Sequence, residues 1–180
     1  MNPWHDIKEE LITPEKFVSI IEIPKGSRKK YEIDKDTGLL LMDRILSTCT
    51  RFPANYGLIP RTLSEDGDPL DVFVLCMDDI HPLAMVYCKP VGLIEMIDCG
   101  EADEKIICVP VADPQFNVYN DVNELPENSF LEIEHFLRVY KDLDKGKVVE
   151  VKQIKGREAA IEVIKTARAA YDKEFKNKKK

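Results

Sequence analysis

The sequence predicts an α+β domain in which a run of strands comes first and two helices come last. Short apolar, β-branched segments separated by prolines and turn residues fill roughly the first four-fifths of the chain, and clear helical spacing begins only near residue 126. Strands and helices do not alternate. The pattern therefore favours a small barrel or sheet with flanking helices over a doubly wound fold.

Apolar, β-branched segments predict the strands in chain order. They cover residues Phe17 to Ile23, Leu39 to Ile45, Val72 to Cys76, Met85 to Ile97, Lys105 to Val109 and Val148 to Ile154. Prolines punctuate the connections. Around Tyr31, period-two alternation predicts that Lys30 and Glu32 share one strand face.

Helical spacing defines the two predicted helices. The first begins between Pro126 and Ser129 and ends near Tyr140, with Ser129 and Glu132 as its predicted capping box. The second follows Gly156. Its apolar face is formed by Ala160, Ile164, Ala167 and Tyr171.

Length and composition predict one compact domain over residues 1–180, because 180 residues is close to the usual size of a single domain. The chain is 44% apolar and 33% charged, which is typical of a globular protein. No apolar run is long enough to span a bilayer, and residues 1–6 lack the features of a secretory signal. The five scattered cysteines form no Cys-x-x-Cys pair, so we expect a cytoplasmic protein. Because no spanning run is present, we also expect no membrane partner.

The charge distribution argues against a nucleic-acid partner. The net charge is −7, whereas general nucleic-acid binding requires a basic surface. Basic residues dominate only at 173–180, where we predict a solvated, frayed tail.

The densest chemical signal is the acidic turn at residues 66–71, Asp-Gly-Asp-Pro-Leu-Asp. At about 4 Å and an effective dielectric near 20, each carboxylate pair repels by roughly 4 kcal/mol. The side chains therefore either splay into water or share divalent cations, and oxygen ligands of this kind suit Mg²⁺, Mn²⁺ or Ca²⁺. Gly67 can adopt a positive φ, Pro69 fixes its own φ, and a buried strand after Asp71 anchors the turn, which favours a metal site.

Charged residues inside otherwise apolar strands are a second signal, because a buried charge is costly unless it is paired, hydrated or bound to a ligand. The set comprises Glu22, Lys30, Glu32, Arg44 and Lys105. If these residues converge on the acidic turn, the acids for metal and the cations for a multiply charged anion form the layout that phosphoryl transfer to water requires. Separate surface ion pairs are the alternative that the positions alone leave open.

A second acidic turn at residues 98–105 lies between two predicted strands and is placed to complete the metal site. Walker A, GxSxG, HExxH and Rossmann motifs are absent from the sequence, so nucleotide-fold and hydrolase-triad interpretations have no support. His5, His81 and His135 do not form a ligand pair by spacing.

Taken together, these features resemble the soluble family I inorganic pyrophosphatases of prokaryotic type. The signature is the turn at residues 66–71. The similarity continues in chain order through residues 22–24, 30–35, 43–44, 55–57, 90–92, 98, 103, 105, 135 and 140–143. Matches at so many ordered positions are far more specific than any single motif.

The resemblance implies a five-stranded OB-like β-barrel with two flanking α-helices. It also implies hydrolysis of pyrophosphate to two phosphates with several Mg²⁺ ions, for which Mn²⁺ or Zn²⁺ can substitute. Asp66, Asp71 and Asp103 would hold the first metal, and Asp71 would also touch the second. Asp98 and Glu32 would serve the metals that arrive with substrate.

The resemblance assigns the phosphates to a set of cations and phenols, Lys30, Arg44, Lys105, Tyr140 and Lys141, together with Tyr56 beside the metal acids. Tyr56 and Glu22 would also support catalysis, Glu22 by ordering the water network of the metal site. Asp68 would accept a proton from the nucleophile. This role also suits the chemistry, since the outer two acids of the turn are committed to metal and a base must keep a free oxygen.

Two positions depart from the family pattern: Phe52, where many bacterial relatives carry Tyr, and Cys99, where they often carry Glu. We expect altered metal affinity or turnover from them, not a lost activity. The alternatives are a non-catalytic divalent-cation-binding or OB-type binding protein and, more distantly, an oligonucleotide-binding barrel, which would need strand aromatics and a basic groove. The short length and His135 on the first helix predict a homohexamer that dissociates in part when His135 is protonated.

Overall fold

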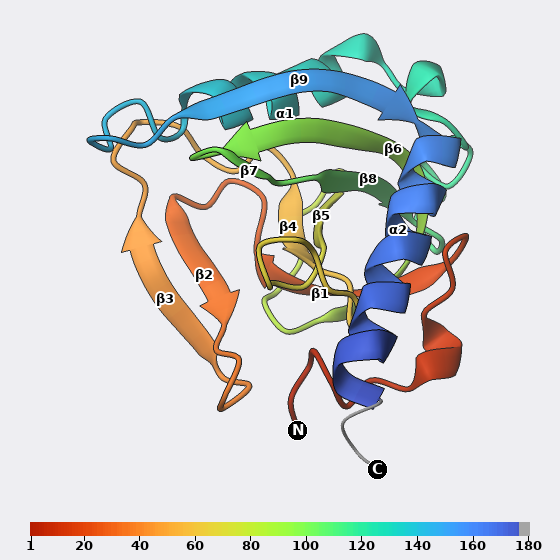
Figure 1. Cartoon of the computed structure of the whole chain (residues 1–180). Coiled ribbons are helices and arrows are strands. Elements are labelled where there is room, and N and C mark those ends of the chain that lie inside the picture. The colour runs from red at the N-terminus through yellow and green to blue at the C-terminus, as the bar shows by residue number, and fades with distance from the viewer. Residues whose placement is uncertain (177–180) are drawn as a thin grey trace.

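The computed structural model describes residues 1–176 and shows a ring of strands flanked by a hairpin and two helices (Figure 1). The strands are β1 (Phe17–Ile23), β2 (Lys29–Ile33), β3 (Leu40–Ile45), β4 (Asn55–Leu58), β5 (Asp71–Val74), β6 (Met85–Asp98), β7 (Glu101–Ala102), β8 (Lys105–Pro110) and β9 (Val149–Gly156). The helices are α1 (Glu127–Val139) and α2 (Arg157–Tyr171), accompanied by the 3-10 turns η1 (Glu9–Leu11) and η2 (Val122–Glu124) and the π-helical turn η3 (Asp172–Lys176).

In the described part of the chain, five strands close into a ring in the order β1, β4, β5, β8 and β6, and β1 completes the ring by pairing with β6. β5 and β8 are parallel, and the other neighbours in the ring are antiparallel. β7 and β9 extend the sheet beyond the ring by pairing with β6. This confirms the predicted α+β fold with a five-stranded OB-like barrel and two flanking helices, since closure pairs the strand edges with one another.

The barrel core explains why its strands read as continuous apolar runs. β1 and β8 are buried along their whole length instead of alternating between buried and exposed positions. On one side, α2 packs Ala160, Ile164 and Ala167 into this core, and on the other α1 contributes Ile133 and Phe136 to a second apolar cluster. The second helix was predicted from this same apolar face.

β4 is the ring strand that the apolar pattern does not reveal. Its residues Asn55–Leu58 are fully buried but do not form an apolar run. Gly57 is essential to its pairing, because a Cβ on Gly57 would lie 1.9 Å from the carbonyl oxygen of Ile20 on β1. Only glycine allows the two backbones to approach this closely.

β2 and β3 pair only with each other and form a hairpin that stands beside the barrel (Figure 1). Lys30 lies opposite Arg44 in the register. The side chains of Leu41, Met42 and Ile45 are about half exposed, so the hairpin lacks a deeply buried core of its own. Its charged residues are therefore carried on an element that is only partly packed against the ring.

The predicted capping box of the first helix is wrong. Pro126 is the N-cap residue of α1 and makes no side-chain capping bond, and the amide of Ser129 donates to the Pro126 carbonyl at 2.9 Å. Glu132 accepts instead from the side chain of Asn128 at 2.8 Å. The helix begins earlier than the box requires, because Pro126, with its fixed φ, sets the first turn.

The predicted lysine-rich tail is only partly described. Residues up to Lys176 continue α2 as η3, and the Lys176 ammonium lies 2.6 Å from Glu9, so this part is helical and paired instead of frayed. Residues 177–180 lie outside the described residues. Over residues 1–176, no helix is both long enough and apolar enough to cross a bilayer.

Candidate active site

A cavity of about 540 Å³ opens between the mouth of the barrel, the β2–β3 hairpin and the end of α1. Every predicted site residue lines it: Glu22, Lys30, Glu32, Arg44, Tyr56, Asp66, Asp68, Asp71, Asp98, Asp103, Lys105, Tyr140 and Lys141. The strand charges thus converge on the acidic turn instead of forming separate surface pairs. The cavity is strongly acidic, with nine carboxylates against five lysine and arginine side chains.

The acidic turn is anchored at both ends. Gly67 has a φ of +83°, as its place in the turn predicts, and the amide of Asp68 donates to Asp66 Oδ1 at 2.9 Å. The amide of Leu70 donates to the hydroxyl of Thr62 at 2.8 Å, and β5 begins at the next residue. The backbone therefore aims the carboxylates of the turn in fixed directions.

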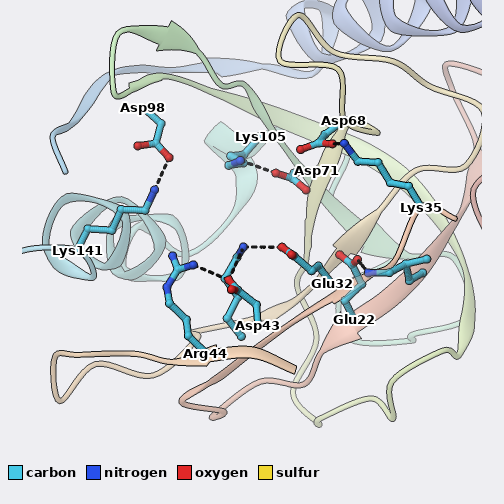
Figure 2. A network of polar contacts seen from close by, with 12 residues as sticks. Glu22, Glu32, Lys35, Asp43, Arg44, Asp68, Asp71, Asp98, Lys105 and Lys141 are labelled. Carbon is cyan, nitrogen blue, oxygen red and sulfur yellow. Dashed lines mark hydrogen bonds and ion pairs between the residues drawn. The ribbon is translucent and has the colours of Figure 1, made fainter. Parts of the chain in front are cut away.

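Lys105 is the electrostatic centre of the barrel wall (Figure 2). Its ammonium lies 2.5 Å from both Asp71 Oδ2 and Asp103 Oδ1, and its side chain is only 5% exposed. Burial alone would lower the pKa of Lys105, but the two carboxylates outweigh this effect and raise that pKa. Lys105 is thus a permanent cation held between two predicted metal ligands.

Two further acids of the cavity, Glu32 and Asp98, also have cationic partners (Figure 2). Lys30 lies 2.9 Å from Glu32, and Lys141 pairs with Asp98. Each pair sets a residue predicted to bind phosphate against one predicted to bind metal. An incoming metal and its phosphate ligand would therefore exchange partners with groups already in place.

Burial raises the pKa of several acidic groups of the cavity, among them Glu22, Asp66 and Tyr56. Burial, followed by the charge of Asp71, raises the pKa of Glu22 to about 8, although the amide of Ile33 donates to its carboxylate at 2.7 Å. Burial, with the neighbouring acids adding to it, raises the pKa of Asp66. Burial and then the charges of Asp71 and Asp103 raise the pKa of Tyr56, so its phenol stays protonated and able to donate.

The donor set fits divalent cations. Oδ1 of Asp98 is buried and accepts no hydrogen bond, which leaves a carboxylate oxygen available to a ligand. The ammonium of Lys105 already shows that a positive charge is stabilised between Asp71 and Asp103. Across residues 1–176, no three acidic, histidine or cysteine side chains are arranged to hold a metal ion. Asp71, Asp98 and Asp103 would hold one by exchanging their lysine partners for it.

Comparison with known proteins settles the family. Residues 19–172 match the family model described as inorganic pyrophosphatase. A soluble inorganic pyrophosphatase of Chlamydomonas reinhardtii is 41% identical over 174 residues, covering 97% of this chain and 90% of that protein, and one of Arabidopsis thaliana is 42% identical over 170 residues, covering 94% and 80%. The crystal structure of the Thermus thermophilus inorganic pyrophosphatase has a TM-score of 0.90 at 38% identity, covering 96% of this chain and 99% of the other.

This chain belongs to the inorganic pyrophosphatase family. The resemblance inferred from the sequence is therefore confirmed. The fold of the solved pyrophosphatase matches the ring and helices described above over nearly the whole length.

The two departures from the expected pyrophosphatase pattern lie at different depths. Phe52 is 3% exposed and packs its ring 5.5 Å from Tyr56 and 4.8 Å from Phe136, so it fills space beneath the cavity without a hydroxyl. Cys99 is exposed at the β6–β7 turn with a φ of +52°. A thiol replaces a potential carboxylate beside Asp98, which lowers the number of acids near the predicted substrate metals.

Sequence reasoning gave no role to several residues of this pyrophosphatase cavity. Tyr31, Asp34, Lys35 and Asp36 line it, and Asp43 lies just behind, 2.5 Å from Arg44 and 3.2 Å from Lys30. Four of these five belong to the stretch 30–36, where lysines and acids are closely spaced. The pairing register of β2 with β3 would have placed these residues at the cavity, since it sets the two strands against each other over the barrel mouth.

Proposed function

We propose that this chain is a cytoplasmic, Mg²⁺-dependent inorganic pyrophosphatase that hydrolyses pyrophosphate to two phosphates. The observation that carries the proposal is the cavity itself. Every predicted acid and cation lines it, and Lys105 joins Asp71 and Asp103 at its barrel wall. Paired carboxylates suit hard divalent cations, and the lysines and arginine suit a multiply charged anion. Family membership supports the same substrate.

In this proposal Asp66, Asp71 and Asp103 hold the first metal, Asp71 also contacts a second, and Asp98 and Glu32 serve the metals that come with substrate. Mg²⁺ is the expected ion, with Mn²⁺ or Zn²⁺ as substitutes. Divalent cations bound there would lower the pKa of a coordinated water and neutralise charge on the phosphates.

The chain's own residues bind and orient the substrate. Lys30, Arg44, Lys105, Tyr140 and Lys141 supply charge-assisted hydrogen bonds to phosphate oxygens, and Tyr56 adds a phenol that burial keeps protonated. These donors face the cavity before substrate arrives, so little reorganisation is required in the transition state.

Asp68 is the proposed general base. The attacking water forms a new P–O bond, its proton passes to Asp68, and the bond from phosphorus to the bridging oxygen breaks to release phosphate. Glu22 supports this step from its position on β1. Its carboxyl is buried on β1 near Asp71, where it can order the water around the acids.

Phosphate release is the direct test. The chain is mixed with pyrophosphate and Mg²⁺, Mn²⁺ or Zn²⁺, with a chelator control, and the released phosphate is measured. Turnover with Mg²⁺ supports the proposal. Calorimetric Mg²⁺ binding without any phosphate release would instead favour a non-catalytic cation-binding protein.

We also propose a homohexamer that uses α1. His135 and Leu131 on this helix, with Arg51 and Pro53 below, line a groove of about 470 Å³ on the outer surface. Light scattering at neutral pH and micromolar concentration should give a hexamer. A monomer at neutral pH would contradict this assembly.

A further inference from the structure

The proposed base, Asp68, has a partner that no assigned role explains. Oδ1 of Asp68 is buried, and the ammonium of Lys35 pairs with it (Figure 2). The Lys35 side chain is 52% exposed and the Asp68 side chain is 49% exposed. A pair this exposed contributes only about 0–1 kcal/mol to folding, so stability is a weak reason for it.

Lys35 comes from the tip of the β2–β3 hairpin, which the amino-terminal segment holds in place. The side-chain amide of Asn2 donates to the carbonyl of Lys35 at 2.8 Å. At Gly38, with a φ of +71°, a Cβ would lie 2.9 Å from the carbonyl oxygen of Met1. The tip therefore packs directly against residues 1–3, and its position depends on them.

The same segment also holds the other partner. The indole of Trp4 is 5% exposed and donates to the carbonyl of Thr62 at 2.8 Å, while the carbonyl of Trp4 accepts from the amide of Arg61 at 3.0 Å. The hydroxyl of Thr62 in turn accepts from the amide of Leu70, at the end of the acidic turn. Residues 2–4 thus connect the hairpin tip to the base of the turn that carries Asp68.

We propose that Lys35 is a positioning residue for Asp68, and that the amino-terminal segment is a clamp that fixes the distance between them. The inference rests on the proposed function in one respect, namely that Asp68 is the base. Lys35 restrains one carboxylate oxygen of Asp68 and leaves the other free to take a proton. An ammonium on a long, half-exposed side chain needs its backbone anchored to do this, and the clamp supplies that anchor.

The first experiment compares Lys35→Met and Lys35→Arg with Lys29→Met as the matched control. Lys29 is an exposed lysine on the same hairpin that does not line the cavity. We expect Lys35→Met to lose roughly tenfold in kcat with KM changed less than about threefold, since the base is present but poorly oriented. Lys35→Arg should recover most of the loss, and Lys29→Met should match the parent.

Mg²⁺ binding without substrate is the second readout, and it should move in the opposite direction. Removing a cation beside the acidic turn strengthens its attraction for Mg²⁺, so Kd should fall by roughly twofold or more in Lys35→Met. A merely structural defect would weaken binding and turnover together. Weakened Mg²⁺ binding, an unchanged kcat, or a raised KM at constant kcat would each overturn the positioning role, the last because Lys35 would then bind substrate.

The clamp is tested with Asn2→Ala against Thr13→Ala, whose side chain makes only local bonds to Lys16 in the same segment. Asn2→Ala should speed amide hydrogen exchange over residues 34–38 several-fold and lower kcat by roughly threefold, because the tip is released while Lys35 remains. Unchanged exchange at the tip would refute the clamp.

Failure of the inference can be distinguished from failure of the proposed function. If the parent chain does not release phosphate from pyrophosphate, the function is wrong, yet the Mg²⁺ titration and the exchange measurement still test the contact between Lys35 and Asp68. If the parent is active and Lys35→Met is equally active, only the positioning role is wrong.

Discussion

The two walls of the cavity carry similar charges in very different surroundings. On the barrel wall, Lys105, Asp103 and Asp71 are 5%, 16% and 27% exposed. Asp71 and Lys105 begin β5 and β8, which pair within the closed ring, and Asp103 lies in the turn before β8. On the hairpin wall, Lys30 and Glu32 are 26% and 45% exposed, and β2 and β3 pair only with each other. Lys105 and Asp103 therefore interact at a lower effective dielectric than the pair of Lys30 and Glu32, whose carboxylate is almost half exposed and is screened by water.

This difference suggests a division of labour. A rigid wall that holds acids in fixed directions suits metal binding, which depends on geometry. A partly exposed wall with long cationic side chains suits a substrate that must enter and leave. The predictions below test this division, beginning with the largest expected effect.

Asp68→Asn should cause the largest loss of turnover. It keeps the shape of the turn but removes the base, so kcat should fall by at least about 10²-fold with nearly normal Mg²⁺ binding. Activity should recover in part as pH rises, because hydroxide then becomes available without a base. Steady-state kinetics across pH and calorimetric Mg²⁺ titration are the measurements.

Asp71→Asn is the matched change on the barrel wall. It removes a metal ligand, so its loss of activity should be offset in part by higher Mg²⁺, and added metal should raise its Tm less than the parent's. If Asp68→Asn loses metal binding while Asp71→Asn keeps it, the assignment of base and ligand is wrong.

Lys105→Met should destabilise the metal-free protein much more than Lys30→Met. Removing Lys105 leaves the partly buried Asp71 and Asp103 without their cation, which costs up to about 3 kcal/mol. Lys30 pairs with the more exposed Glu32, and loss of this ion pair costs about 1 kcal/mol or less. Chemical denaturation at neutral pH with a chelator gives both values, and equal losses would show that the walls do not differ.

Glu22 should make the metal-free protein less stable as pH rises. Its folded-state pKa of about 8 exceeds the ordinary value of 4.5, so between these values the folded state binds more protons than the unfolded state. Stability should fall by roughly 1 kcal/mol per pH unit between about pH 5 and 8. Glu22→Gln should remove this slope. Denaturation midpoints of parent and variant at pH 6 and pH 8.5 test it, and parallel slopes would contradict the burial of an ionisable Glu22.

Parts of the barrel wall could be predicted directly from the sequence. β1 was predicted over the residues it occupies, Phe17–Ile23, because its apolar run is buried on both faces. The acidic turn could be predicted for a similar reason, since Gly67 and Pro69 restrict the backbone locally. Where neighbouring residues determine the backbone conformation, the sequence pattern is enough to predict it.

The partners on the hairpin wall depend on long-range geometry instead. Lys35 meets Asp68 across 33 positions in the chain, and no local periodicity encodes that contact.

β4 was missed because Gly57 is required by the backbone of β1 and adds nothing to an apolar pattern. The capping box failed for the opposite reason: the motif of Ser129 and Glu132 was present, but Pro126 began the helix first.

Asp43→Asn should have the smallest effect and should act on substrate affinity alone. Asp43 lies behind the hairpin wall and pairs with both Lys30 and Arg44, at 3.2 and 2.5 Å. Without it, two long side chains lose their restraint and must be ordered when substrate binds, which costs about 0.5–1.5 kcal/mol for each. We expect KM for pyrophosphate to rise several-fold, kcat to stay within about twofold, and the free energy of unfolding to change by less than about 1 kcal/mol. A matching change at Asp103 should instead impair metal binding, because the barrel wall holds the metal ligands. If Asp43→Asn lowers kcat and the affinity for Mg²⁺ in the absence of substrate, as a barrel-wall change does, the hairpin helps to hold the first metal and the division between the walls fails.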